Sequence, residues 1–216
     1  TSNVLSVSVG NEIDAFNWSG DVDDVDSVEN FREFISNVSD HSAFTSGGVD
    51  RAFTGTLRGL TEVPAPYDWT LLEPVVDLIH VTYYPIDSNF QVEDPSVVST
   101  DMSNLVNKFS TPIYMQEVGY QSSTTSNSSE SQQAQFFCNF FHAWDTHSAS
   151  ITRASILRFN DVSQASAEST ATTYGVGGNT NFIEYIRTLG LRSYDGTGTD
   201  KQAFSIVDSE TGKRGW

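Results

Sequence analysis

The sequence predicts an α/β protein of parallel strand–helix units, on three observations. Short β-rich apolar segments alternate with segments of helical periodicity along the 216 residues. Polar residues follow several strands at once, as they do where parallel strands end at a functional edge. No Gly-rich phosphate-binding turn follows any strand. A doubly wound sheet and a (β/α)8 barrel both fit, and the missing phosphate-binding turn favours the barrel.

The first half of the chain contains three predicted strands. Residues 4–9 form the first, which stops at Gly10-Asn11-Glu12, and helical periodicity follows over residues 28–38. Residues 52–60 read as the second strand. Residues 75–84 are the third and most continuously apolar strand, and Pro85 ends it.

The second half continues the alternation. Pro95 opens a helix, residues 112–118 form the fourth strand, and Ser129 begins a capping box before an aromatic-rich helix. Residues 151–159 form the fifth strand. A helix over residues 182–189 is expected to end at Gly190. The remainder reads as a poorly structured tail with one helical turn.

Composition narrows the classes of ligand. The chain has 28 acidic against 11 basic side chains and a formal net charge of -17, which repels nucleic acid and suits a neutral glycan. No apolar run approaches the roughly 20 residues that span a bilayer, so no membrane segment is expected. One cysteine, Cys138, and four scattered histidines predict neither a disulfide nor a metal site, and no cofactor is implied.

Two carboxylates occupy strand ends. Glu12 follows the first strand, and Glu117 lies at the end of the fourth in an apolar context. Side chains at the carboxyl ends of barrel strands converge on one mouth. Glycoside hydrolysis needs such a pair, one carboxyl to protonate the departing oxygen and one to attack or to activate water. Asp14 is expected at a solvated surface or helix start, and His80 as a hydrogen-bonded core residue.

Three short motifs carry a resemblance to a known group of enzymes. Gly10-Asn11-Glu12-Ile13 resembles the fourth-strand signature of the clan A retaining glycoside hydrolases, which are (β/α)8 barrels. Gln116-Glu117-Val118-Gly119-Tyr120 is similar to their seventh-strand signature around the nucleophile. Thr82-Tyr83-Tyr84-Pro85 resembles the sixth-strand element of the arabinogalactan endo-β-1,4-galactanases. The motifs total about a dozen residues, in the expected order.

The resemblance implies roles for individual residues. Glu12 would be the general acid/base and Glu117 the nucleophile of a double displacement in a β-linked poly- or oligosaccharide. Asn11 would bind the sugar hydroxyl beside the anomeric carbon. Tyr83 or Tyr84 would donate to Glu117, with Tyr83 preferred. Residues expected to bind substrate from loops and strand ends, with packing under a loop as the equal alternative for the tryptophans, are Trp18, Trp69 and Asn160.

The resemblance also implies a partial barrel. If Glu12 ends the fourth strand, residues 1–216 form a single glycosidase catalytic domain that carries strands 4–8 and lacks strands 1–3, as a C-terminal fragment would. The missing barrel half or a second copy of the chain is then an expected partner. A polysaccharide substrate further implies a secreted or extracytoplasmic enzyme.

Three alternatives to an active glycosidase stay open. One is a carbohydrate-binding barrel without turnover, and another is an inactive fragment of a glycosidase. The third is an unrelated αβ domain whose acidic surface contacts protein or metal.

Overall fold

The computed structural model describes residues 4–15, 26–41, 44, 48–62, 67–194 and 198–215. It forms two compact units, each treated by itself below. The first unit takes the described part of Thr1–Tyr83 with Asp101–Glu117 and His147–Ser155, and the second takes Tyr84–Thr100, Val118–Thr146 and the described part of Ile156–Trp216.

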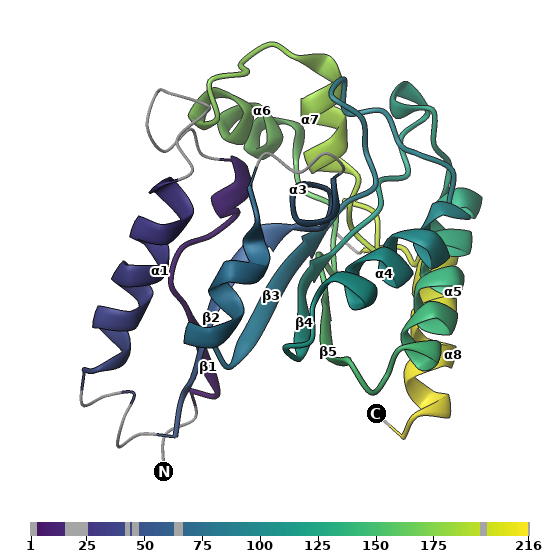
Figure 1. The fold of residues 1–216 in the computed structure, drawn as a ribbon. Helices are drawn as coiled ribbons and strands as arrows, with labels where there is room; N and C mark the ends of the chain where they lie inside the picture. The colour runs from purple at the N-terminus through teal and green to yellow at the C-terminus, as the bar shows by residue number, and fades with distance from the viewer. Residues whose placement is uncertain are drawn as a thin grey trace. The chain divides into compact units, whose positions relative to one another are not determined.

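A five-stranded parallel sheet organises the first unit. The strands lie in the order of the chain, so that each strand is hydrogen-bonded to its neighbour in sequence (Figure 1). This arrangement confirms the predicted α/β class and is that of a partial (β/α)8 barrel. The strands are β1 (Ser6–Ser8), β2 (Asp50–Thr56), β3 (Leu78–Tyr83), β4 (Ile113–Val118) and β5 (Ile151–Ile156).

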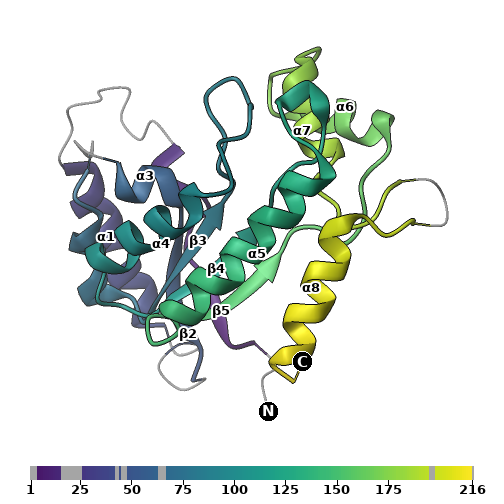
Figure 2. The ribbon, with the colours of Figure 1, turned by 90° about the vertical axis from the view of Figure 1, so that its right-hand side faces the viewer.

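Register divides the sheet into two faces. Thr54 pairs with His80 and Thr56 with Thr82, so these side chains share one face, while Ile79 and Tyr83 point to the other. Helices lie together on one side of the strands (Figure 2). They are α1 (Asp26–Ser39), α3 (Leu57–Thr61) and the part of α4 (Val97–Lys108) from Asp101 onward.

The second predicted strand was too long at its carboxyl end. β2 stops at Thr56, whose hydroxyl accepts from the amide of Gly59 and so caps α3. Residues 57–60 are therefore helical rather than extended. The third strand likewise begins later than predicted, at Leu78, because the 3₁₀ helix η2 (Trp69–Val75) extends to Val75 and has Val76 as its C-cap.

In the second unit two helices lie side by side (Figure 2): α5 (Glu130–Thr146) and α8 (Gln202–Lys213). The guanidinium of Arg214 stacks 4.8 Å from the ring centre of Phe141 and pairs with Asp145 and Glu210. The prediction of a poorly structured tail is therefore wrong, since its last part is a three-turn helix held by packing and ion pairs.

The other helices of the second unit surround a small apolar core. α6 (Gln164–Thr173) packs on α7 (Thr180–Arg187), and the 3₁₀ helix η3 (Thr124–Ser126) lies near them. α6 replaces a stretch that the sequence left without structure, because its buried face consists of small alanines. The core residues are Ala167, Ala171, Phe182, Ile183, Tyr185 and Leu189.

A buried ion pair braces the same unit. The ammonium of Lys201 donates to Oδ1 of Asp161 at 2.7 Å, and these side chains are 4% and 8% exposed. Lys201 also donates to the hydroxyl of Ser122 and the carbonyl of Thr188. These further hydrogen bonds, together with the one that Asp161 accepts from the amide of Gly190, offset the free-energy cost of burying the two charges.

Gly190 has a different role from the predicted helix cap. α7 ends at Arg187 with Thr188 as its C-cap, and Gly190 donates its amide to Asp161. A methyl group on Gly190 would lie 2.0 Å from the amide nitrogen of Asp161 and 2.2 Å from the carbonyl carbon of Asn160. Glycine is therefore required for the close approach of two backbone segments.

Gly190→Ala is expected to destabilise the protein by about 3 kcal/mol, because backbone atoms must move to admit the methyl group. Gly212→Ala is the matched control. Gly212 lies inside α8 with nothing within 4 Å of the added carbon, so alanine should stabilise the helix by up to about 1 kcal/mol. Urea unfolding of the three proteins measures both effects, and equal stability of Gly190→Ala and the parent would contradict the steric account.

Candidate active site

Glu12 lies in a tight turn directly after β1. Gly10 has a φ of +97° and Glu12 a φ of +48°, both in the left-handed region. Such a conformation is uncommon for glutamate and persists where surrounding contacts hold it. One such contact is the hydroxyl of Thr82, at the end of β3, which donates to Oε1 of Glu12 at 2.8 Å. The turn and the hydrogen bond together place the Glu12 carboxyl at the carboxyl end of the sheet.

Glu117, the last residue but one of β4, belongs to the same unit and is half-buried. Burial raises the pKa of the Glu12 carboxyl above its ordinary value, and the charges of Glu117 and Asp14 add to this increase, whereas the hydrogen bond from Thr82 opposes it. The structure thus brings both predicted catalytic carboxylates within electrostatic range of each other, so that one influences the proton affinity of the other.

Asp14 is a third carboxylate in this region. It accepts from the backbone amide of Thr56 at 2.7 Å and from the Thr56 hydroxyl, and burial raises its pKa. Of the two places expected for Asp14, a solvated surface or a helix start, the structure has the helix start, because Asp14 lies half-buried in the first turn of η1 (Ile13–Ala15) and joins it to the end of β2. Gly59 is needed beside it, since an added methyl carbon would lie 2.0 Å from Oδ2 of Asp14.

A layer of hydrogen-bonded polar side chains occupies the face that Thr82 shares. Nδ1 of His80 lies 2.9 Å from Oε1 of Gln116, which also accepts from Thr54. Since an amide oxygen only accepts, Nδ1 carries a hydrogen, and Nε2 of the neutral ring accepts from Ser6. Burial, the largest influence, lowers the pKa of His80. The prediction of a hydrogen-bonded core histidine is confirmed. The His80 ring holds the side chain of Gln116, the residue before Glu117.

Tyr83 points away from this layer. Its hydroxyl donates to Oδ2 of Asp101 in α4 at 2.8 Å, and the side chain is 2% exposed. A phenol has one hydrogen to donate, so the preference for Tyr83 as the donor to Glu117 was wrong. The physical reason is strand alternation, which turns Thr82 rather than Tyr83 toward Glu12.

The aromatic loop residues divide differently. Trp69 is 2% exposed, donates its indole N–H to the carbonyl of Gly59 and meets the ring of Tyr67 edge-on. This placement favours the packing alternative for Trp69 over stacking on a sugar. Trp18 lies outside the described residues, so its predicted role stays a prediction.

Three further predicted residues have been placed. Asn11 is exposed in the turn before Glu12, where it is open to a ligand. Tyr84 belongs to the second unit and packs edge-on against Tyr185. Asn160, also in the second unit, is exposed and forms a parallel bridge with Arg192. The substrate-binding roles of these residues stay predictions.

The sequence interpretation missed Thr82. It directly precedes the two tyrosines of the Thr82-Tyr83-Tyr84-Pro85 motif, and His80, two residues earlier, points to the same face of the strand. A threonine at the end of a buried strand is common in barrel packing, so its residue type alone carries no signal. Only the pairing of Thr82 with Thr56 and its contact with Glu12 identify it.

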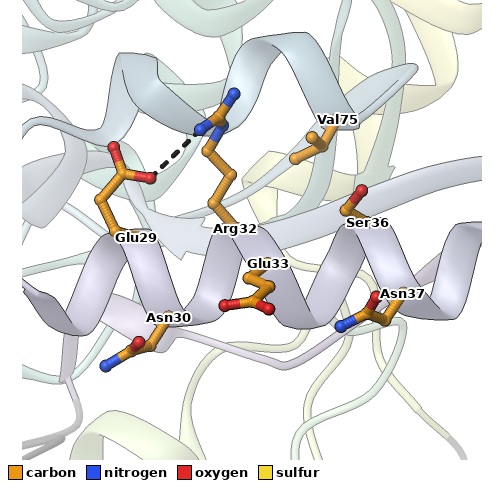
Figure 3. Close-up of a pocket in the computed structure, with 7 residues that line it drawn as sticks. All are labelled: Glu29, Asn30, Arg32, Glu33, Ser36, Asn37 and Val75. Carbon is orange, nitrogen blue, oxygen red and sulfur yellow. Dashed lines mark hydrogen bonds and ion pairs between the residues drawn. The ribbon is translucent and has the colours of Figure 1, made fainter.

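Two surface depressions in the described part of the chain lie on helices, and neither is lined by any of these residues. The larger runs along α1 beside the end of η2, where Arg32 and Glu29 form an ion pair at 3.2 Å (Figure 3). The charged side chains that line it are largely exposed to solvent and do not form a cluster of catalytic or ligand-binding groups. The side chains drawn there are Glu29, Asn30, Arg32, Glu33, Ser36, Asn37 and Val75.

Two further searches cover only the described residues. Among them no three His, Cys, Asp or Glu side chains gather in a way that could hold a metal ion. No helix in the described ranges has the length and apolar character needed to cross a membrane.

No family model matches the chain, and no curated protein does. Solved structures resemble its fold at low identity. An active-site mutant of Rhizomucor miehei β-1,3-glucanosyltransferase in complex with laminaritriose matches with a TM-score of 0.57 and 13% identity, over 93% of this chain and 63% of that one. Ruminococcus gnavus β-glucuronidase matches with a TM-score of 0.55 and 12% identity, over 86% of this chain and 29% of that one.

A third neighbour is the GH2 β-galacturonidase of Eisenbergiella tayi bound to galacturonate, with a TM-score of 0.56 and 16% identity. The match covers 31% of that structure's chain. This chain therefore spans less than two thirds of the length of each of the three structures. The structural neighbours are thus carbohydrate-processing enzymes with a parallel-strand α/β fold. At these identities the likeness shows the fold alone.

Proposed function

We propose that the chain carries the catalytic residues of a retaining glycoside hydrolase that cleaves β-linked, neutral poly- or oligosaccharides. One observation carries the proposal. Two carboxylates from separate strand ends interact electrostatically: burial and the charge of Glu117 raise the pKa of the half-buried Glu12, although the hydrogen bond from Thr82 opposes this rise. Two carboxyl groups with distinct environments are what acid and nucleophile roles require. The fold neighbours support the class.

The mechanism assigns one role to each carboxyl. In the first step the Glu117 carboxylate attacks the anomeric carbon, the glycosidic C–O bond breaks, and Glu12 transfers its proton to the departing oxygen. In the second step Glu12, now a carboxylate, takes a proton from water while the water oxygen attacks the anomeric carbon. Glu117 leaves as a free carboxylate, Glu12 is protonated again, and two inversions give net retention.

The mutual influence of the carboxyls suits this change of role. While Glu117 is charged, it raises the pKa of Glu12, which favours the proton that the first step needs. Ester formation with the sugar removes that charge. The Glu12 pKa then falls, which favours the carboxylate that the second step needs. A single neighbour thus serves both roles of Glu12.

Asn11 remains the best-placed substrate ligand by this proposal, because it is exposed beside Glu12 and could bind the hydroxyl next to the anomeric carbon. Trp69 is not retained as a stacking platform, since its ring is buried. The net charge of -17 supports a neutral rather than a uronic acid substrate. Action on a polysaccharide further supports a secreted enzyme.

The stereochemistry of the first product tests the mechanism. The protein is incubated with aryl β-glycosides of neutral sugars and uronic acids and with β-1,3- and β-1,4-linked oligosaccharides, and proton NMR follows the reducing sugar before mutarotation. The β anomer is expected first, from a neutral sugar. An initial α anomer would contradict retention, and glycan binding without turnover would contradict hydrolysis. Products longer than the substrate would identify a sugar acceptor in place of water.

A further inference from the structure

We propose that Thr82 is a positioning residue that reserves Oε1 of Glu12 for its own hydrogen bond and thereby directs the catalytic proton to Oε2. The inference rests on the proposed function for its consequence in catalysis. The geometric part concerns only the Glu12 carboxyl and holds whether or not the protein turns over a glycan.

The hydroxyl of Thr82 is held firmly in place. The side chain is 2% exposed, and its branched Cβ restricts rotation about χ1. Parallel pairing of Thr82 with Thr56 fixes the register of β3 against β2, and this register fixes the position of the Thr82 hydroxyl on its face of the sheet. The hydroxyl has one hydrogen to donate, and Oε1 of Glu12 accepts it at an oxygen–oxygen distance of 2.8 Å.

A protonated carboxyl has two unequal oxygens, and only one bears the proton. The carbonyl-type oxygen is the better acceptor, so a hydroxyl that donates to Oε1 stabilises the form in which Oε2 carries the hydrogen. Without Thr82 the proton distributes between the two oxygens. The Thr82 contact therefore favours one direction for proton delivery, which is what a general acid needs to meet a departing oxygen.

Other groups that act on Glu12 do not perform this task. Glu117 from β4 and Asp14 from η1 are both acidic, and their charges favour the protonated carboxyl without distinguishing its oxygens by a hydrogen bond. The Asp14 oxygens accept from Thr56. Thr82 is the donor to Glu12 that the described structure shows.

Thr82→Val removes the hydroxyl at nearly constant volume, and Thr82→Ser retains it. The first readout is independent of activity: the side-chain carboxyl ¹³C resonance of Glu12, assigned by its loss in Glu12→Gln, is titrated by NMR. The pKa of Glu12 is expected to rise in Thr82→Val, because a bond that favours the ionised form is lost, and to return toward the parent value in Thr82→Ser. An unchanged titration in Thr82→Val overturns the positioning role.

The second readout concerns leaving groups. For glycosides with poor leaving groups, kcat/KM is expected to fall about tenfold in Thr82→Val and to recover in Thr82→Ser. For dinitrophenyl glycosides, which leave without protonation, the fall should be less than about threefold. Equal losses for both substrates would overturn the proton-directing role. A parent protein without turnover, combined with the expected titration, would contradict the proposed function alone.

Discussion

Glu117→Ala is expected to abolish hydrolysis, with kcat reduced by about 10⁵-fold or more, as is typical when a covalent nucleophile is lost. The methyl side chain cannot form the glycosyl ester, and the space it leaves can admit a small anion. Added azide should therefore attack the anomeric carbon directly and give an α-glycosyl azide in a single inversion. Product analysis by NMR and mass spectrometry measures both the loss and the rescue.

Glu168→Gln supplies the control for this variant. Glu168 is an exposed carboxylate of α6 that accepts from Gln164, so its replacement removes one negative charge and none of the residues assigned to the candidate site. Parental activity is expected. A β-glycosyl azide from Glu117→Ala, or undiminished hydrolysis, would remove Glu117 from the nucleophile role.

Glu12→Ala is expected to slow hydrolysis by about 10²- to 10⁴-fold for substrates that need leaving-group protonation, and much less for dinitrophenyl glycosides in the first step. Hydrolysis of the glycosyl-enzyme still lacks its base, so a burst of dinitrophenol should precede a slow steady state. Azide should speed that second step and give a β-glycosyl azide, the product of two inversions. Stopped-flow absorbance and NMR measure these outcomes.

The pH dependence of the parent separates Glu12 from other carboxyls. Because the pKa of Glu12 is raised above 4.5, the acid form persists to higher pH than in a free glutamate, and kcat/KM should fall as pH rises through that pKa. Glu12→Gln should lack this limb of the profile. A limb that persists unchanged in Glu12→Gln would assign the acid to another group.

Strand periodicity was enough to predict the parallel sheet, and strand-end carboxylates singled out Glu12 and Glu117, which interact electrostatically and whose catalytic roles stay predictions. The signal is strong because buried parallel strands are continuously apolar, and polar residues at their ends stand out. The sequence was less informative where tertiary contacts decide. α8 has few large apolar residues, so its sequence lacks the apolar periodicity that would predict a helix. Its ion pairs and its packing on α5 stabilise the helix instead.

The error at Tyr83 has a structural cause. Tyr83 and Tyr84 both suit a donor role, and only the pairing of β2 with β3 reveals which parity faces Glu12. That parity selects Thr82, a residue type without a distinctive signature. Asp14 lies at a helix start, one of its two expected places, but its contact with Thr56 could not be predicted, because Thr56 lies 42 residues away and no local pattern links them.

The hydrogen bond between Thr82 and Glu12 joins residues 70 positions apart, with β2 lying between their strands. Closing a loop of this length costs conformational entropy, so the environment of the Glu12 carboxyl depends on the tertiary pairing of β1, β2 and β3 rather than on local structure. Local opening of β1 would undo it without unfolding the rest. A tight-binding sugar analogue should accordingly slow amide hydrogen exchange in β1 and at the end of β3 together, which makes exchange protection of these strands a direct readout of site assembly.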